Sequence, residues 1–167
     1  MRSARGGVAS QLSSLGSRGV GWTGIQFVLI WVVIGAGVRG RADISGAELV
    51  VAMLAGCALI ALGTAILFSG IRRLGVSLSA LPKPVDDGVL IEDGVYAYVR
   101  HPIYLGVILV VVGYSVAMDA LVALIVSVVL AMFLDLKARH EETLLRQRYP
   151  DYAAYASRTK RFIPYVY

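Results

Sequence analysis

Two polar segments of the chain contain most of the side chains that could bind a ligand or take part in a reaction. The first, residues 86–106, contains Arg100, His101 and Tyr104 in close succession. The second, residues 135–145, contains Lys137, Arg139, His140, Glu141 and Glu142. Such side chains hold charged small molecules through ion pairs and charge-assisted hydrogen bonds. Two histidines are too few and too loosely arranged to indicate a metal site, so no metal is expected.

The first segment reads as an ordered loop that enters a helix. Pro82 and Pro84 exclude a continuous helix before it, and the Asp-Gly pairs at 87–88 and 93–94 are turn signals. Pro102 suits the first position of a helix, which places His101 near the N-terminal cap. The backbone amides of that first turn could then hold a carboxylate group.

The second segment continues an apolar stretch as a helix that emerges into water. Lys137 and Glu141 are four residues apart and share one face of that helix. The apolar stretches on either side of Asp119 are expected to pack as antiparallel neighbours. The emerging helix should therefore return to the side where His101 and Tyr104 enter, and the two polar segments should meet.

Each of these residues also has an ordinary structural interpretation. His101 beside a proline can be a cap or an interface residue, and Tyr96, Tyr98 and Tyr104 can be aromatic anchors at the membrane surface. The charged residues after Leu136 can form a solvated helix face with ion pairs along it.

The helices that would position these segments are predicted to lie in a membrane. The chain has 167 residues, of which 57% are hydrophobic and 16% charged, with a mean hydropathy of +0.72. Three apolar blocks stand out, and the third is long enough for two helices if it is broken at Asp119. We therefore expect an all-α integral membrane protein with four transmembrane helices, the last two forming a C-terminal helical hairpin. The spans are predicted at about 22–38, 47–68, 103–118 and 120–136.

The remaining segments complete a single membrane domain, residues 22–167. Residues 1–21 are expected to form a flexible cytoplasmic tail, although a cleaved signal sequence is an alternative for the first span. Residues 70–81, with leucines at helical spacing, are predicted to lie on the membrane as an amphipathic helix. Cys57 lies in an apolar run and is expected to serve packing.

The distribution of basic residues predicts the orientation. With four spans, fourteen of the sixteen Lys and Arg residues fall on one side and only Arg39 and Arg41 on the other. Because basic loops stay in the cytoplasm, both termini and residues 69–100 should be cytoplasmic, in the plasma or inner membrane. The aromatic residues lie inside apolar runs and do not alternate with basic ones, so no nucleic-acid partner is expected.

The order of these motifs resembles a known family. The chain contains Gly94-Val95-Tyr96-x-x-Val99-Arg100-His101-Pro102-x-Tyr104-x-Gly106, then a hydrophobic hairpin, then Glu141-Glu142-x-x-Leu145, and finally Tyr152-x-x-Tyr155 and Arg161-Phe162-Ile163-Pro164. This pattern, over roughly residues 90–164, closely resembles the isoprenylcysteine carboxyl methyltransferases and the related phospholipid methyltransferases.

The resemblance implies an S-adenosylmethionine pocket at the cytoplasmic end of the hairpin, covered by the C-terminal segment. By position in the family motifs, the cofactor-binding residues are expected to be Leu90, Ile91, Gly94, Val95, Tyr96, His101, Pro102, Ile103, Tyr104 and Glu141. Lys137, Arg100 and Glu141 are expected to be the catalytic residues. The substrate would be amphipathic or lipid-like, either an isoprenylcysteine carboxylate or a lipid head group, in contact with membrane lipids.

Two departures from the family pattern bear on the substrate. Members that act on a prenylcysteine carboxylate tend to have an arginine four residues before the first glutamate, where this chain has Lys137. Lysine offers a point charge without the two-pronged grip of a guanidinium. The usual Phe-Gly-x-x-Tyr is replaced by the shorter Tyr149-Pro150-Asp151-Tyr152. Two alternatives remain open, an NADPH-dependent membrane reductase of the sterol reductase type and a membrane scaffold without catalysis.

Overall fold

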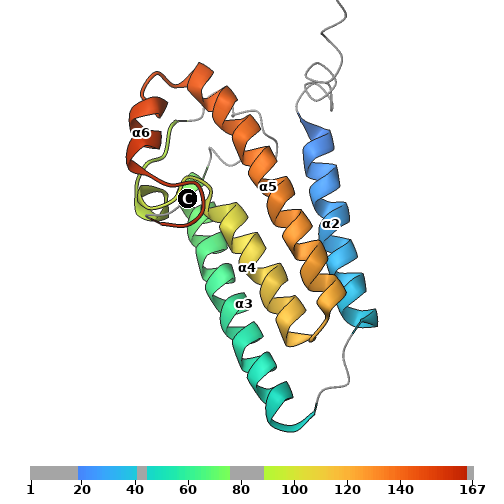
Figure 1. The fold of residues 1–167 in the computed structure, drawn as a ribbon. Coiled ribbons are helices and arrows are strands. Elements are labelled where there is room, and N and C mark those ends of the chain that lie inside the picture. Colours follow the sequence, from blue (N-terminus) through green and yellow to red (C-terminus); the bar gives the residue numbers. More distant parts are fainter. Residues whose placement is uncertain (1–18, 41–44, 76–88, 165–167) are drawn as a thin grey trace, which may run out of the picture.

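The computed structural model describes residues 19–40, 45–75 and 89–164, and within them the chain is all-α (Figure 1). It forms five α-helices and one short 3₁₀ helix, and the described part has no β-strand. The elements are α2 (Val20–Arg39), α3 (Gly46–Leu74), η2 (Gly94–Ala97), α4 (Pro102–Ala117), α5 (Leu121–Arg148) and α6 (Tyr152–Arg158). The predicted fold class is confirmed at this level. Most of the predicted N-terminal tail lies outside the described residues.

Three of the helices, α2, α3 and α5, are long and apolar enough to cross a membrane. Large apolar side chains such as Trp31, Val51 and Leu121 are two-thirds exposed on their outer faces, as expected where lipid is the solvent. The chain is thus an integral membrane protein. Helix α4 is apolar but has only 16 residues, about 24 Å at 1.5 Å per residue. Its role as the fourth span stays a prediction.

The predicted surface helix over residues 70–81 is wrong in its first part. Residues 70–74 are the last turn of α3, which continues six residues beyond the predicted end of the second span. Arg72 and Arg73 occupy that last turn, where positive charge is favourable for the helix dipole. Residues 76–81 lie outside the described residues.

The four apolar helices stand in one antiparallel row, in the order α3, α4, α5, α2 (Figure 1). A tight turn joins α4 to α5, and Asp119 in this turn has a left-handed φ of 46°. The predicted break at Asp119 is confirmed. Because neighbours run in opposite directions, the start of α4 and the ends of α3 and α5 lie together. We call this end of the row, where α2 also begins, the polar end.

Helices α3 and α4 pack with their backbones in contact through glycines. Gly56 and Gly63 of α3 face Gly113 and Gly106 of α4. A Cβ atom on Gly63 would lie 2.7 Å from the carbonyl oxygen of Gly106, and one on Gly56 would lie 2.5 Å from that of Gly113. These approaches are possible only without side chains, which is how small residues let membrane helices associate closely.

The C-terminal segment folds back over the polar end. Helix α5 has 28 residues, about 42 Å in length, and so extends past the start of α4 before the chain turns into α6 (Figure 1). The amides of Arg100 and His101 then donate hydrogen bonds to the carbonyls of Lys160 and Arg161, at 2.8 and 3.2 Å. The segment after α6 is thereby fixed against the residues that begin α4.

Candidate active site

The two polar segments meet at Glu141, as the sequence predicted. The Tyr104 hydroxyl on α4 donates a hydrogen bond to one carboxylate oxygen of Glu141 on α5. The other oxygen lies 3.6 Å from Nδ1 of His101. The rings of His101 and Tyr104 are parallel, with centroids 5.5 Å apart. The Glu141 side chain keeps 15% of its surface exposed, so these neighbours do not enclose it completely.

Lys137 lies one helical turn from Glu141, on the same face of α5. It is 1% exposed, although lysine is almost never fully buried without a partner. Its Nζ donates a hydrogen bond of 2.8 Å to Oε1 of Gln26 on α2 and lies 5.2 Å from the centroid of the Tyr104 ring. Helices α2, α4 and α5 therefore each contribute a side chain to the surroundings of the Lys137 ammonium.

Glu142, next along α5, is the centre of a separate ion-pair cluster. Its carboxylate accepts hydrogen bonds from Nε of Arg100 at 2.9 Å and from two nitrogens of Arg161 at 3.1 and 3.2 Å. Arg161 also donates to Asp135 at 2.9 Å. Its hydrogen bonds to Glu142 raise the pKa of the Arg161 guanidinium above its ordinary value. The C-terminal segment is thus tied to α5 by charge.

Arg100, predicted as catalytic, lies within that cluster. Beyond Glu142 it donates hydrogen bonds to the backbone carbonyls of Ala156, at 3.1 Å, and Thr159. In this position it connects the start of α4 to the segment that covers it. Its catalytic role stays a prediction.

His101 stands between the two glutamates and is 8% exposed. Its Nε2 lies 3.3 Å from Glu142 but makes no hydrogen bond within the described part of the chain. A buried polar atom without a hydrogen bond is costly, so this atom is a candidate contact for a ligand or a water molecule. As the sequence predicted, His101 is the cap of α4 and Pro102 its first residue.

The loop before α4 carries the other predicted cofactor residues and is held from two sides. Asp93 pairs with Arg73 of α3, and Glu92 pairs with Arg158 of α6. Gly94 has a left-handed φ of 61°, which glycine adopts at little cost. Leu90, Ile91 and Val95 are half-buried in this loop.

Tyr96 lies in η2, within this loop, and is buried. Its carbonyl accepts a hydrogen bond of 2.8 Å from the Tyr155 hydroxyl. Burial, and then the neighbouring Tyr155 and Glu141, raise the pKa of the Tyr96 hydroxyl above its ordinary value. This side chain is therefore neutral and can offer a hydrogen-bond donor and a flat wall.

Pro102 and Ile103, two of the predicted cofactor residues, pack against α3. A Cβ atom on Gly70 of α3 would lie 2.9 Å from Cγ1 of Ile103 and 3.3 Å from Cγ of Pro102. These side chains pack against α3, whereas Tyr104, His101 and Glu141 come together.

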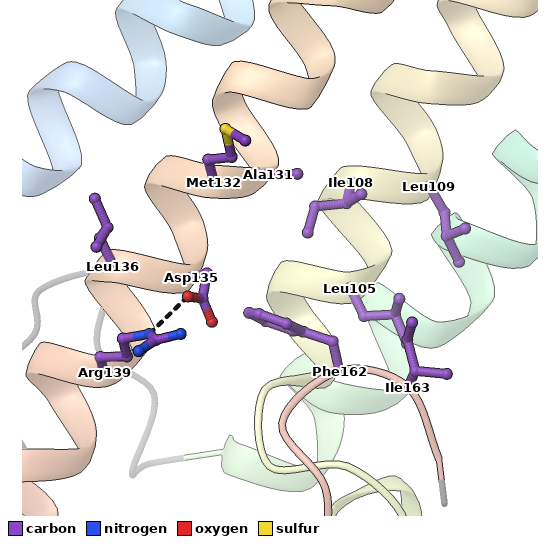
Figure 2. A pocket seen from close by; sticks show the side chains of 10 residues that line it. All are labelled: Leu105, Ile108, Leu109, Ala131, Met132, Asp135, Leu136, Arg139, Phe162 and Ile163. Atoms are coloured by element: carbon purple, nitrogen blue, oxygen red, sulfur yellow. Dashed lines mark hydrogen bonds and ion pairs between the residues drawn. The ribbon is translucent and has the colours of Figure 1, made fainter. Parts of the chain in front are cut away.

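An apolar groove of about 830 Å³ lies between α4 and α5 (Figure 2). Its lining is apolar except at one end, and consists of Leu105, Ile108, Leu109, Ala131, Met132, Asp135, Leu136, Arg139, Phe162 and Ile163. At the polar end Nε of Arg139 donates to Asp135 at 2.7 Å. The Phe162 ring, which points into the groove in Figure 2, is 6.0 Å from the His101 ring, centroid to centroid. Phe162 therefore lies between the groove and His101.

Three residues of this region were not among the predicted site residues. Glu142 and Arg161 belong to the motifs that resemble the family, but the sequence did not predict a role for either of them. Gln26 is a polar residue inside an apolar span, and such residues are functional candidates by default. That signal could have identified it. Residues 19–40, 45–75 and 89–164 contain no group of three or more His, Cys, Asp or Glu side chains that could hold a metal ion.

Comparison with known proteins shows the family to which the chain belongs. The phospholipid methyltransferase family model matches residues 51–152, which include His101, Tyr104, Lys137 and Glu141 but not Gln26. The chain is also 32% identical over 111 residues to the protein-S-isoprenylcysteine O-methyltransferase of Schizosaccharomyces pombe. That match covers 64% of this chain and 47% of the relative, so the chain spans less than half of that protein's length. The chain belongs to the phospholipid methyltransferase family, which confirms the resemblance seen in its motifs.

Proposed function

We propose that this protein transfers a methyl group from S-adenosylmethionine to an amphipathic acceptor that resides in the membrane. The observation that carries the proposal is the convergence of Tyr104, His101 and Glu141 at the polar end, beside the buried Lys137. Membership of a methyltransferase family supplies the reaction class.

The residues present fit such a cofactor. S-adenosylmethionine carries a carboxylate, an ammonium group, hydroxyl groups and a sulfonium centre, which supplies the methyl group when the cofactor is bound. Glu141 is largely buried and can accept hydrogen bonds from a cationic or hydroxyl-bearing part of the cofactor. Tyr96 and Tyr104 offer flat walls, and the loop amides from Leu90 to Val95 can hold the carboxylate. His101 Nε2, buried without a hydrogen bond within the described residues, offers a further polar contact.

The residues contribute positioning more than acid-base chemistry. Methyl transfer from a sulfonium requires an in-line approach of the acceptor atom in a site that excludes water. Burial of His101 and Lys137 indicates that the part of the polar end around these two side chains is shielded from water. In this scheme Glu141 holds the cofactor, Lys137 places a positive charge beside Glu141 and Tyr104, and Arg100 keeps the C-terminal cover in place.

The acceptor class follows from the surroundings. The groove between α4 and α5 offers apolar walls to a hydrocarbon tail, with charged groups at Asp135 and Arg139 where it ends. Such a surface suits a molecule whose tail lies in lipid while its head reaches the interface. An isoprenylcysteine carboxylate and a phospholipid head group both meet this description, and both appear in the names of the family and its relative.

The same proposal includes the topology. We propose that α4 is a fourth span and that the polar end, with both termini, faces the cytoplasm of a plasma or inner membrane. The support is the fourteen-to-two distribution of basic residues. A cysteine accessibility scan with single cysteines at the polar end and at Asp119 would test it. Labelling of both from the same side of a sealed vesicle would contradict it.

Cofactor binding is the experiment that tests the proposal. The protein in nanodiscs is titrated calorimetrically with S-adenosylmethionine, S-adenosylhomocysteine and NADPH, and compared with Glu141→Gln and His101→Ala. We expect saturable binding of both adenosyl compounds that each substitution weakens at least tenfold. Binding of NADPH alone would favour the reductase alternative, and binding of none would favour a scaffold; either result would overturn the proposal.

A further inference from the structure

Gln26 connects α2, the first described helix, to Lys137 at the candidate site. Helix α2 lies outside the matched family region, residues 51–152. Gln26 is the one residue with a side-chain amide between Trp22 and Val38. An amide inside a membrane span is unfavourable unless it is hydrogen-bonded, and this one accepts a bond of 2.8 Å from Lys137.

The contact continues from α2 to the proposed cofactor residues. The lysine ammonium that Gln26 holds lies over the Tyr104 ring, 5.2 Å from its centroid. The Tyr104 hydroxyl in turn donates to Glu141. Gln26 therefore reaches Glu141 through two side chains, each of them in direct contact with the next.

We propose that Gln26 is a positioning residue for the cofactor site, so that α2 is a functional part of it and not only a packing helix. The inference rests on the proposed function. The lysine side chain is flexible and its ammonium can take many positions. A fixed acceptor on α2 selects the position over Tyr104 and keeps the positive charge near Glu141, and this preorganises the carboxylate that is proposed to bind the cofactor.

The test compares two replacements of Gln26 with a neighbouring control. Gln26→Met keeps the length of the side chain but removes the acceptor, whereas Gln26→Glu keeps an acceptor for the ammonium. Phe27→Leu alters a lipid-exposed side chain on the same helix, 54% exposed. Each variant is titrated calorimetrically with S-adenosylmethionine in nanodiscs at a temperature well below its measured unfolding midpoint.

We expect Gln26→Met to weaken binding about tenfold, which corresponds to about 1.4 kcal/mol. Gln26→Glu and Phe27→Leu should stay within about threefold of the unchanged protein. A double-mutant cycle measures the coupling between Gln26 and Lys137 in cofactor binding, which a general packing role of Gln26 would not produce. In a Lys137→Met background, Gln26→Met should have no further effect on binding, because the contact that it removes is already absent.

The outcomes separate this inference from the proposed function. If the unchanged protein binds the cofactor and Gln26→Met binds it equally well, the inference is overturned and the proposed function stands. Equal weakening by Gln26→Met and Phe27→Leu, or additive effects of the Gln26 and Lys137 substitutions, would also overturn it. If the unchanged protein does not bind the cofactor, the proposed function fails and this inference fails with it.

Discussion

Replacing Glu142 by glutamine tests how the C-terminal segment is held over the site. The substitution keeps the shape of the side chain but removes the negative charge that Arg100 and Arg161 share. Glu142 is 5% exposed, and the side chains of Arg100 and Arg161 are 11% and 15% exposed. The charges are therefore poorly screened by solvent, and the two guanidinium groups would be left facing each other across a neutral amide.

The expected loss follows from what each arginine retains. Removing one partner of a buried ion pair costs about 3 to 5 kcal/mol. Arg161 keeps its hydrogen bond to Asp135, and Arg100 keeps its bonds to the carbonyls of Ala156 and Thr159. We therefore expect the lower limit, about 3 kcal/mol, and expect it to appear as local opening of the C-terminal segment while the helix row stays folded.

Hydrogen exchange measures this opening directly. The amides of Arg100 and His101 are bonded to the carbonyls of Lys160 and Arg161, so their protection reports whether the segment is closed. About 3 kcal/mol corresponds to a loss of protection of roughly a hundredfold.

Glu92→Gln is the matched control for this measurement. Its pair with Arg158 is more exposed, and the arginine side chain is 55% accessible, so we expect an effect below about 1 kcal/mol. If Glu142→Gln changed protection no more than Glu92→Gln, the reasoning about the buried cluster would be refuted.

Three further predictions concern packing and burial. Gly63→Leu should separate α3 from α4, because even a Cβ would lie 2.7 Å from a backbone oxygen; we expect a loss of at least about 1 to 3 kcal/mol in detergent unfolding, and unchanged stability would contradict the contact. Tyr152→Phe should leave stability unchanged or raise it by up to about 1 kcal/mol in thermal unfolding, because the buried hydroxyl makes no hydrogen bond within the described residues. A loss of stability of more than about 1 kcal/mol would mean that the hydroxyl has a hydrogen-bond partner, and would contradict this prediction. Burial raises the pKa values of Tyr96, Tyr152 and Tyr155, so the unfolded chain releases these protons first and stability should fall as pH rises above about 10. A pH titration of unfolding that is flat to pH 12 would contradict this.

The helices and the meeting of the two polar segments could be predicted because both depend on local spacing. Apolar blocks of span length and the break at Asp119 define the helices, and Pro102 fixes the start of α4. Lys137 and Glu141 are four residues apart and therefore share a face wherever the helix begins. Once the hairpin is antiparallel, α5 must run back past the start of α4, which brings Glu141 to the end of the row where Tyr104 lies.

The partners of these residues could not be predicted, because they come from distant parts of the chain. Glu141 and Glu142 are neighbours in sequence, yet they point about 100° apart around the helix. Only the path of the C-terminal segment, which brings Arg161 to Glu142, decides which of them is held in the ion-pair cluster. Likewise, the glycines of α3 recur every seven residues, but the sequence does not state which helix they face.

The predicted end of the second span was wrong because the helix continues into residues that are no longer apolar. The predicted end of the second span followed hydropathy, which drops after Phe68. The helix itself continues to Leu74, since nothing in residues 69–74 breaks it and the arginines there suit its C-terminal end.

Transfer of a labelled methyl group measures the proposed reaction itself. The protein in nanodiscs is incubated with S-adenosylmethionine carrying a radioactive methyl group, and with vesicles that contain either phosphatidylethanolamine or an S-prenylcysteine compound. Glu141→Gln is the control. We expect label in the organic-extractable product of one of these acceptors, at a rate that Glu141→Gln lowers at least tenfold. Cofactor binding without any transfer to lipid-soluble acceptors, or equal transfer by Glu141→Gln, would contradict this expectation.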